Sequence, residues 1–212
     1  MTPITQPPAV DPAHWGMRLV YTPDRPPARG MYPLLTASIA PRPIAWVSTV
    51  SPDGVPNLAP YSFFTVACTD PAIVSVTSIG RKDTFRNVEG TGEFVVNIGT
   101  EALMDVINAT SAPVGPEVDE FSAQGLTAEA SDVVAAPRVA EAPIALECVR
   151  HDVVDLGTSA MILGRVVSVS LDESVLADDG LPDFGALLPP SRLGRDEWGY
   201  APRTRRLDRP TR

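Results

Sequence analysis

Short runs of β-branched and apolar residues, each bounded by a turn signal, dominate the chain from residue 43 onward. Pro43–Val50 is apolar on both faces, which is typical of a buried strand. The SPDG sequence at 51–54 is a β-hairpin signal. Asn57–Cys68 predicts a second strand, in which Pro60 forces an edge or irregular position because proline has no N–H for a ladder. This pattern restricts the fold to one built mainly from neighbouring antiparallel strands.

The rest of the chain continues the pattern and adds only a few short helices. Further strands are predicted at Ala72–Ser78, within 91–99, at Ile144–Val153 and at Ala160–Leu171. Short helices are predicted at Asp83–Glu89, with Asp83 as the N-cap, and at Glu101–Ala109. Residues 110–140 are mixed and rich in loops. We therefore expect a mainly β fold, a small antiparallel β-barrel with helices packed outside it.

Proline marks the two ends of the chain. Eight of the 23 prolines lie within the first 33 residues, and five lie beyond residue 181. Proline-rich flanks of this kind are typically extended. The expected organisation is a Pro-rich N-terminal arm at residues 1–30, one folded domain at 31–200 and a C-terminal tail at 201–212.

The net charge of −9 is concentrated in one region. Residues 101–180 carry 3 basic and 15 acidic side chains, whereas residues 1–100 are neutral. This acidity argues against nucleic acid as a partner. The chain has no leader-like start and no apolar run near the roughly 18 residues of a membrane span, so a cytoplasmic protein without membrane partners is expected. Two cysteines make no disulfide framework, and no metal-ligand spacing occurs.

Two segments near the first predicted hairpin are candidates for binding a ligand. In Pro41–Thr49, Arg42 precedes a stiff strand that ends in Ser48 and Thr49, and such groups hold an anion or a carbonyl. The alternative is a strand end whose hydroxyls satisfy the turn. Asn57–Phe64 crowds aromatic and small polar residues, which suits either a flat heteroaromatic ring or an ordinary core strand.

The third candidate segment is Ser78–Asn87. A glycine turns the chain, and Arg81, Lys82, Asp83 and Thr84 then lead into a short helix. Free N–H groups at a helix start, two cations and a hydroxyl together make a phosphate site, and the alternative is a solvent-exposed helix start. Lys82 is the only lysine among 17 basic residues, which draws further attention to this segment.

The order of these segments and their amino-acid sequences resemble those of one family. PRPIAWVST, a D-G turn, NLAPYSFF, R-K-D-T-x-x-N and GEFVVNI are together similar to the flavin reductase-like, FMN-binding split-barrel family. LECVRHDVVDLGTSAMILGRVVSV resembles its later strand pair, and PPSRLGRDEWGYAPRTRRLDRP its closing segment. The resemblance covers roughly residues 31 to 210. It implies a six-stranded antiparallel split barrel that forms a homodimer, with FMN, more readily than FAD, near the subunit interface.

The resemblance also implies roles for individual residues. The flavin ring and ribityl chain would lie along Trp46, Val47, Ser48 and Thr49 and along Asn57, Ala59, Pro60, Tyr61, Ser62 and Phe63. The phosphate would meet Arg81, Lys82 and Thr84, with Asp83 and Asn87 supporting the loop. Arg192 and Tyr200 would close a nicotinamide pocket, unless they serve C-terminal packing. Where relatives often carry a histidine, this chain has Thr158, Ser159 and Ala160.

The expected reaction is hydride transfer from NADH or NADPH to flavin. The cofactor carries this chemistry, so no side chain is assigned as a catalytic acid or base. Backbone N–H groups within 59–62 are expected to stabilise the reduced ring. Three alternatives remain open: an FMN-containing electron carrier passing electrons to an acceptor protein, a non-catalytic flavin-binding protein, and the reductase component of a two-component monooxygenase.

Overall fold

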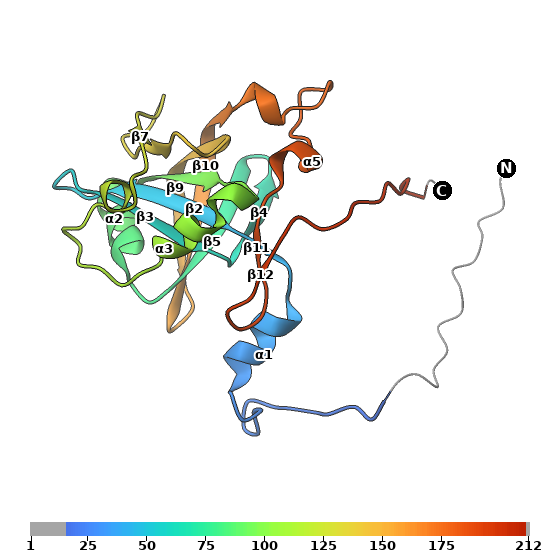
Figure 1. The fold of residues 1–212 in the computed structure, drawn as a ribbon. Coiled ribbons are helices and arrows are strands. Elements are labelled where there is room, and N and C mark those ends of the chain that lie inside the picture. Colours follow the sequence, from blue (N-terminus) through green and yellow to red (C-terminus); the bar gives the residue numbers. More distant parts are fainter. Residues whose placement is uncertain (1–15, 211–212) are drawn as a thin grey trace.

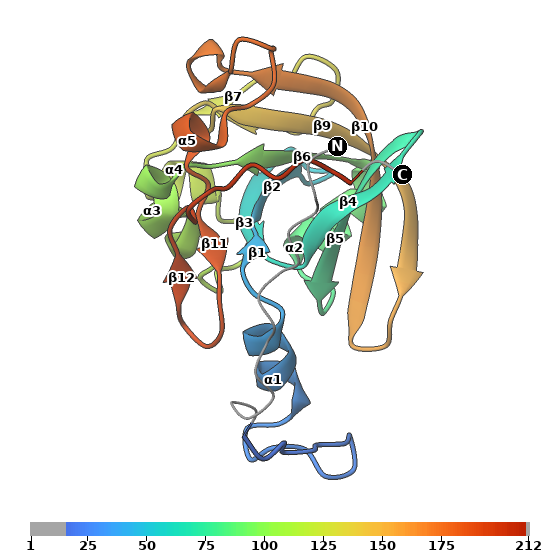
Figure 2. The same cartoon turned by 90° about the vertical axis from the view of Figure 1, so that its right-hand side faces the viewer.

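A single antiparallel sheet of seven strands forms the body of the protein. The computed structural model describes residues 16–210. The strands are ordered β3-β2-β6-β9-β10-β5-β4 across the sheet. Their bounds are Ala45–Val50 for β2, Pro56–Tyr61 for β3, Phe64–Thr69 for β4, Ala72–Ile79 for β5, Glu93–Ile98 for β6, Ile144–Asp155 for β9 and Ser159–Leu171 for β10. Figures 1 and 2 show this sheet curving around with helices outside it, which confirms the predicted mainly β architecture.

One bent strand joins the two edges of the sheet. β3 and β4 lie at opposite ends of the strand order, yet only Ser62 and Phe63 separate them in sequence. The N–H of Thr77 in β5 donates to the carbonyl of Phe63 at 2.9 Å. The strand predicted at 57–68 is therefore one segment that bends between two partners. Counted as one strand, β3–β4 makes the barrel six-stranded, and Pro60 lies at the sheet edge as expected.

Apolar side chains fill the inside of the curved sheet. The largest core cluster draws on Val47, Val76, Phe94, Cys148 and Ile162, and Phe85 packs against them from outside the sheet. The turn between β2 and β3 forms at SPDG as predicted, with Gly54 at φ 85. Burial raises the pKa of the Cys148 thiol to about 12, so this cysteine packs as an apolar side chain.

Gly164 in β10 is a point of close approach within this core. A β-carbon there would lie 2.2 Å from Cζ of Phe94 and 3.1 Å from Cβ of Cys148. We expect Gly164→Ala to lower the free energy of unfolding by about 1–3 kcal/mol, because the Phe94 ring is packed on all sides and has to shift. Urea denaturation measures this effect. Gly16→Ala, where the added carbon meets no atom within 4 Å, should leave stability unchanged.

The helices are short and lie outside the sheet. They are α1 at Met31–Ser38, α2 at Asp83–Thr91, α3 at Met104–Ala109, α4 at Glu120–Gln124 and α5 at Phe184–Leu187. Helices at α2 and α3 were predicted, but the N-cap of α2 is Lys82 rather than Asp83. Asp83 is instead the first helical residue and pairs with Arg86. The sequence did not predict α1, because only Thr36 of this helix is buried and no amphipathic pattern marks it.

Two small sheets complete the structure outside the main sheet. β1 at Arg42–Pro43, β11 at Ser191–Arg192 and β12 at Trp198–Gly199 form one, and β7 at Ala128–Glu129 pairs with β8 at Arg138–Val139. In the first of these sheets, β1, which directly precedes β2, pairs with the C-terminal hairpin of β11 and β12. Within the described part of the chain, no helix is long and apolar enough to cross a membrane.

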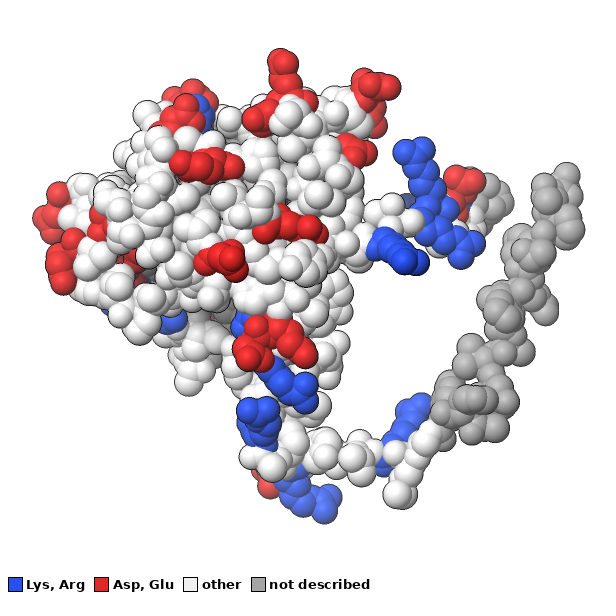
Figure 3. Space-filling view, viewed as in Figure 1, with Lys and Arg blue, Asp and Glu red and all other residues white. Residues whose placement is uncertain are grey.

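Both ends of the described chain lack regular structure. Residues 16–30 form no helix, and residues 200–210 follow the last strand without further pairing. Figure 1 shows both segments extending away from the barrel. The expected arm and tail also include residues 1–15 and 211–212, which lie outside the described residues. On the face in Figure 3, acidic side chains are scattered over the barrel, whereas many basic ones lie on the arm and tail.

Candidate functional site

The largest hollow of functional interest opens between the edge strand β3 and the start of α2. Its volume is about 430 Å³. Two smaller hollows of about 150 and 160 Å³ adjoin it and share Pro60 and Tyr61 with it. We refer to the first as the main hollow. Its walls comprise Asn57, Ala59, Pro60, Tyr61, Ile79, Gly80, Arg81, Lys82, Asp83, Thr84, Arg86, Thr110, Ser111, Ala112, Pro113, Val114 and Glu120.

Two of the three predicted ligand segments meet at these hollows. Eight predicted residues line the main hollow: Asn57, Ala59, Pro60, Tyr61, Arg81, Lys82, Asp83 and Thr84. Ser62 and Phe63 line the hollow of about 160 Å³, together with Tyr32 of α1. The aromatic and small polar segment thus lies beside the cationic helix start, although 16 residues separate Phe64 from Arg81 along the chain.

The edge strand β3 presents few backbone N–H donors to the main hollow. The N–H of Leu58 points away from β2 and donates to Oε2 of Glu120 at 3.0 Å. Because the sides of an antiparallel strand alternate, the N–H groups of Ala59 and Tyr61 face β2. Pro60 has no N–H. Residues 59–61 therefore offer the hollow no backbone donor, and Ser62 lies past the end of β3, in the bend.

The cations at the start of α2 differ in their partners. Arg81 contacts Glu89 at 3.2 Å and Asp155 at 3.3 Å, and it lies over the ring of Phe85. Arg86 pairs with Asp83. Lys82 is exposed and lines two of the hollows, and its ammonium group makes no hydrogen bond or ion pair with residues 16–210. It is therefore the cation best placed to meet an anion from solution.

A buried polar network fixes the floor of the main hollow. Nδ2 of Asn57 donates to Oγ1 of Thr84 at 3.0 Å and to Oγ1 of Thr49 at 3.3 Å. Nδ2 of Asn87 donates to the same Thr49 oxygen at 3.0 Å. Thr49 and Asn87 do not line the hollow. They hold Asn57 in place, so the structure gives them a positioning role rather than ligand contact.

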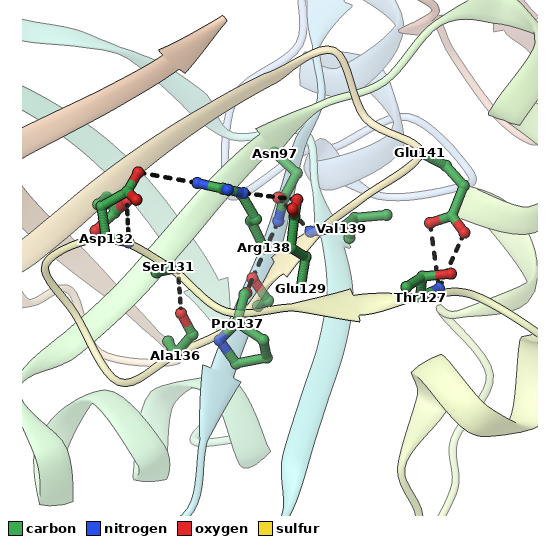
Figure 4. A network of polar contacts seen from close by, with 12 residues as sticks. Asn97, Thr127, Glu129, Ser131, Asp132, Ala136, Pro137, Arg138, Val139 and Glu141 are labelled. Carbon is green, nitrogen blue, oxygen red and sulfur yellow. Dashed lines mark hydrogen bonds and ion pairs between the residues drawn. The ribbon is translucent and has the colours of Figure 1, made fainter. Parts of the chain in front are cut away.

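The remaining predicted residues of β2 are buried behind β3. Nε1 of Trp46 donates to Oγ1 of Thr110 at 2.9 Å, and Val47 belongs to the barrel core. Ser48 donates to the carbonyl of Pro137 and accepts from Asn97, whose amide oxygen accepts the N–H of Val139. Figure 4 shows this cluster with the loop that carries Arg138. The expectation that a ligand lies along Trp46–Thr49 gains no support from the structure, because each of these four residues is at most 1% exposed.

Burial shifts the pKa of two groups at the main hollow. Desolvation raises the pKa of the Tyr61 phenol, and hydrogen bonds with Thr84 and Ser78 oppose this shift. Desolvation likewise raises the pKa of the Glu120 carboxyl, while the N–H of Leu58 opposes it and Asp83 and Asp119 add to it. Neither shift creates an acid and base pair beside the hollow.

Sequence analysis missed Glu120, Thr110 and Ser111. They lie in the segment 110–140, which has no strong periodicity, and only the fold brings them to β3. One local signal exists, because Asp119 accepts the N–H of Phe121 at 2.9 Å as the N-cap of α4. That signal predicts a helix start but does not place Glu120 at a ligand site.

Of the two C-terminal candidates for a nicotinamide pocket, Arg192 lies at the site and Tyr200 does not. Arg192 lines the hollow of about 150 Å³ with Tyr61, Ser62 and Trp198. Its guanidinium lies 5.2 Å from the centre of the Trp198 ring and donates to the carbonyls of Glu197 and Arg195. Tyr200 is 72% exposed and lines none of the three hollows, so the structure does not bring it to the site.

The turn that carries Thr158 lies next to the cationic segment. The N–H of Gly80 donates to the carbonyl of Thr158 at 2.9 Å, and Asp155 in the same hairpin pairs with Arg81. Ser159 and Ala160 continue into β10, where they pair with Ile79 and Ser78 of β5. Thr158, Ser159 and Ala160, which stand where relatives often carry a histidine, therefore hold the strand end and turn that precede Lys82 in the sequence.

A family model describing a flavin reductase like domain matches residues 37–186. The chain therefore belongs to the flavin reductase-like family, an oxidoreductase family, and the resemblance in its sequence motifs is confirmed. The model match spans most of the barrel, including β3, the start of α2 and the main hollow.

Individual relatives agree with this assignment. The Halalkalibacterium halodurans protein BH2278 is 39% identical over 201 residues, which cover 89% of this chain and 95% of that protein. The structure is similar to nitrilotriacetate monooxygenase component B from Bacillus cereus, at 35% identity and a TM-score of 0.86, covering 91% of this chain and 100% of the other. It is also similar to flavoredoxin of Desulfovibrio vulgaris, at 26% identity and a TM-score of 0.74, covering 79% and 90%.

Proposed function

We propose that the protein binds FMN in the main hollow and transfers a hydride from NADH or NADPH to it. The single observation that carries this proposal is the unpartnered Lys82 at the start of α2, beside a hollow walled by Pro60 and Tyr61. A cation and the free N–H groups of a helix start suit a phosphate, and the adjoining aromatic and apolar wall suits a flat ring. FAD fits less readily.

The polar residues that line the hollows indicate which side chains would hold each part of the cofactor. Lys82 and Arg81 would meet the phosphate, Asn57 and Thr84 would form the floor, and Ser62 would offer its N–H to the ring. Bound flavin supplies the redox chemistry, so the side chains bind, orient and shield rather than transfer protons. The hollow beside Arg192 and Trp198 adjoins the same wall and is our candidate for the nicotinamide.

We further propose that the protein acts as a homodimer. Tyr32, Leu35 and Ile39 of the α1 region leave more than half of their surfaces exposed, and Val66 does the same on β4. Exposed apolar side chains grouped on one helix support an interface with another copy. Tyr32 also lines a hollow of the site, so such an interface would lie close to the cofactor.

Two alternatives keep the cofactor but change the electron path. The likeness to flavoredoxin favours an electron carrier that exchanges electrons with another protein. The likeness to a monooxygenase component B favours a reductase that serves a separate oxygenase. Both alternatives require FMN in the main hollow. They differ from each other in whether a nicotinamide reduces the bound flavin.

Anaerobic mixing with NADH and NADPH tests the proposal. We expect the visible flavin absorbance to bleach within seconds with at least one of the two nicotinamides, because hydride transfer needs no other component. Stopped-flow absorbance measures the rate and the nicotinamide preference together. Bleaching by dithionite but by neither nicotinamide would favour the electron carrier instead. A protein that neither contains nor binds flavin would contradict the whole proposal.

A further inference from the structure

We propose that Glu120 opposes the flavin phosphate, so that its charge weakens FMN binding without weakening the binding of an unphosphorylated flavin. This inference rests on the proposed function and concerns the same hollow. It assigns to Glu120 a part in choosing between phosphorylated and unphosphorylated ligands. Glu120 lies on α4, 59 positions after the end of β3, and none of the sequence motifs includes it.

Glu120 lies in the part of the main hollow where we propose that the FMN phosphate binds. Its Oε2 accepts the N–H of Leu58, and the neighbouring Asn57 donates to Thr84, two residues after Lys82. Glu120 is only 8% exposed, and it lines the main hollow together with Lys82. A carboxylate held in this position has little water around it, so it interacts with a nearby charge more strongly than an exposed carboxylate does.

The charges around the hollow nearly cancel. Its lining contains three cations, Arg81, Lys82 and Arg86, and two carboxylates, Asp83 and Glu120, for a net charge of +1. Arg86 is paired with Asp83, and Arg81 is paired with Glu89 and Asp155 outside the lining. Lys82 alone has no such partner among residues 16–210. Because the positive charge is so small, one ionised carboxylate changes phosphate affinity appreciably.

The protonation of Glu120 then makes this affinity depend on pH. The groups that face it are Asp83 from α2, Asp119 from its own helix and Tyr61 from β3, and burial with the two aspartates raises its carboxyl pKa. A bound phosphate raises that pKa further, because like charges disfavour the ionised form. FMN binding should therefore take up protons, and FMN affinity should fall as the pH rises through the pKa of Glu120.

The test compares FMN with riboflavin in wild-type protein and in Glu120→Gln between pH 5 and 9. Glutamine retains an oxygen for the N–H of Leu58 and removes only the charge. At the alkaline end we expect Glu120→Gln to bind FMN about tenfold more tightly than wild type, the order given by Coulomb's law for charges ~10 Å apart at an effective dielectric constant near 20. The two proteins should converge as the pH falls through the pKa of Glu120. Riboflavin affinity should stay equal in both at every pH.

Matched controls separate this inference from the proposed function. Glu117→Gln removes an exposed charge from the same segment and should leave every affinity unchanged. Titration calorimetry in buffers of different ionisation enthalpy should show more proton uptake on FMN binding in wild type than in Glu120→Gln over the pH range where Glu120 titrates, because ionisation of the FMN phosphate itself is common to both proteins. If FMN binds but Glu120→Gln keeps the wild-type pH profile, the role of Glu120 is refuted. If neither flavin binds, the proposed function itself fails.

Discussion

Replacing Lys82 by alanine is expected to weaken FMN binding about 10-fold to 100-fold and to leave riboflavin binding nearly unchanged. A charge-assisted hydrogen bond contributes about 1.5–3 kcal/mol, and only FMN carries the phosphate that Lys82 would meet. The Lys82 side chain is exposed and makes no hydrogen bond or ion pair within the described chain, so the substitution should not disturb folding. Quenching of flavin fluorescence on titration measures both affinities.

Arg81→Ala provides the comparison for Lys82. Arg81 already contacts Glu89 and Asp155, so it has less free charge to offer a phosphate, and the loss of FMN affinity should be smaller. These exposed pairs contribute little to stability, so folding should remain intact. Equal losses of FMN and riboflavin in Lys82→Ala would mean that Lys82 does not meet the phosphate. A larger loss in Arg81→Ala than in Lys82→Ala would assign the phosphate to Arg81.

The strands were predictable because each depends on local residues. Val47 and Val95 lie in β-branched runs that ended at recognisable turns, and the SPDG hairpin formed where expected. Lys82 could be singled out because a glycine turn followed by cations at a helix start is a local pattern. The bend at Ser62 was not predictable in detail, since it depends on the two different strands that pair with its halves.

Burial and strand order, which the motifs do not encode, decide which side chains reach the main hollow. Ser48 and Trp46 belong to a motif that resembles cofactor-binding relatives. In the structure β2 lies between β3 and β6, and both side chains make buried hydrogen bonds within the protein. Glu120 reaches β3 from a segment without a pattern of its own. No residue spacing encodes either fact, because each one follows from which strand lies at the edge of the sheet.

Arg42 was one candidate in the sequence for holding an anion or a ligand carbonyl, and the structure buries it among protein acceptors. Its guanidinium donates to the carbonyls of Thr36 and Ile39 at the end of α1, to the carbonyl of Leu193 and to Oγ of Ser62. One side chain thus ties together α1, the hairpin of β11 and β12, and the bend between β3 and β4. All three elements supply walls to the hollows around Tyr61.

Arg42→Met should therefore lower the free energy of unfolding by about 3–5 kcal/mol, because buried acceptors lose their donor together. It should also weaken FMN and riboflavin alike, since the loosened walls contact the ring rather than the phosphate. Urea denaturation and flavin titration measure the two effects. Arg42→Lys should recover only part of the stability, because one ammonium cannot reach three directions. Arg165→Met, at an exposed arginine of β10, should change stability by less than about 0.5 kcal/mol, and an equal result at Arg42 would contradict its role as a clamp.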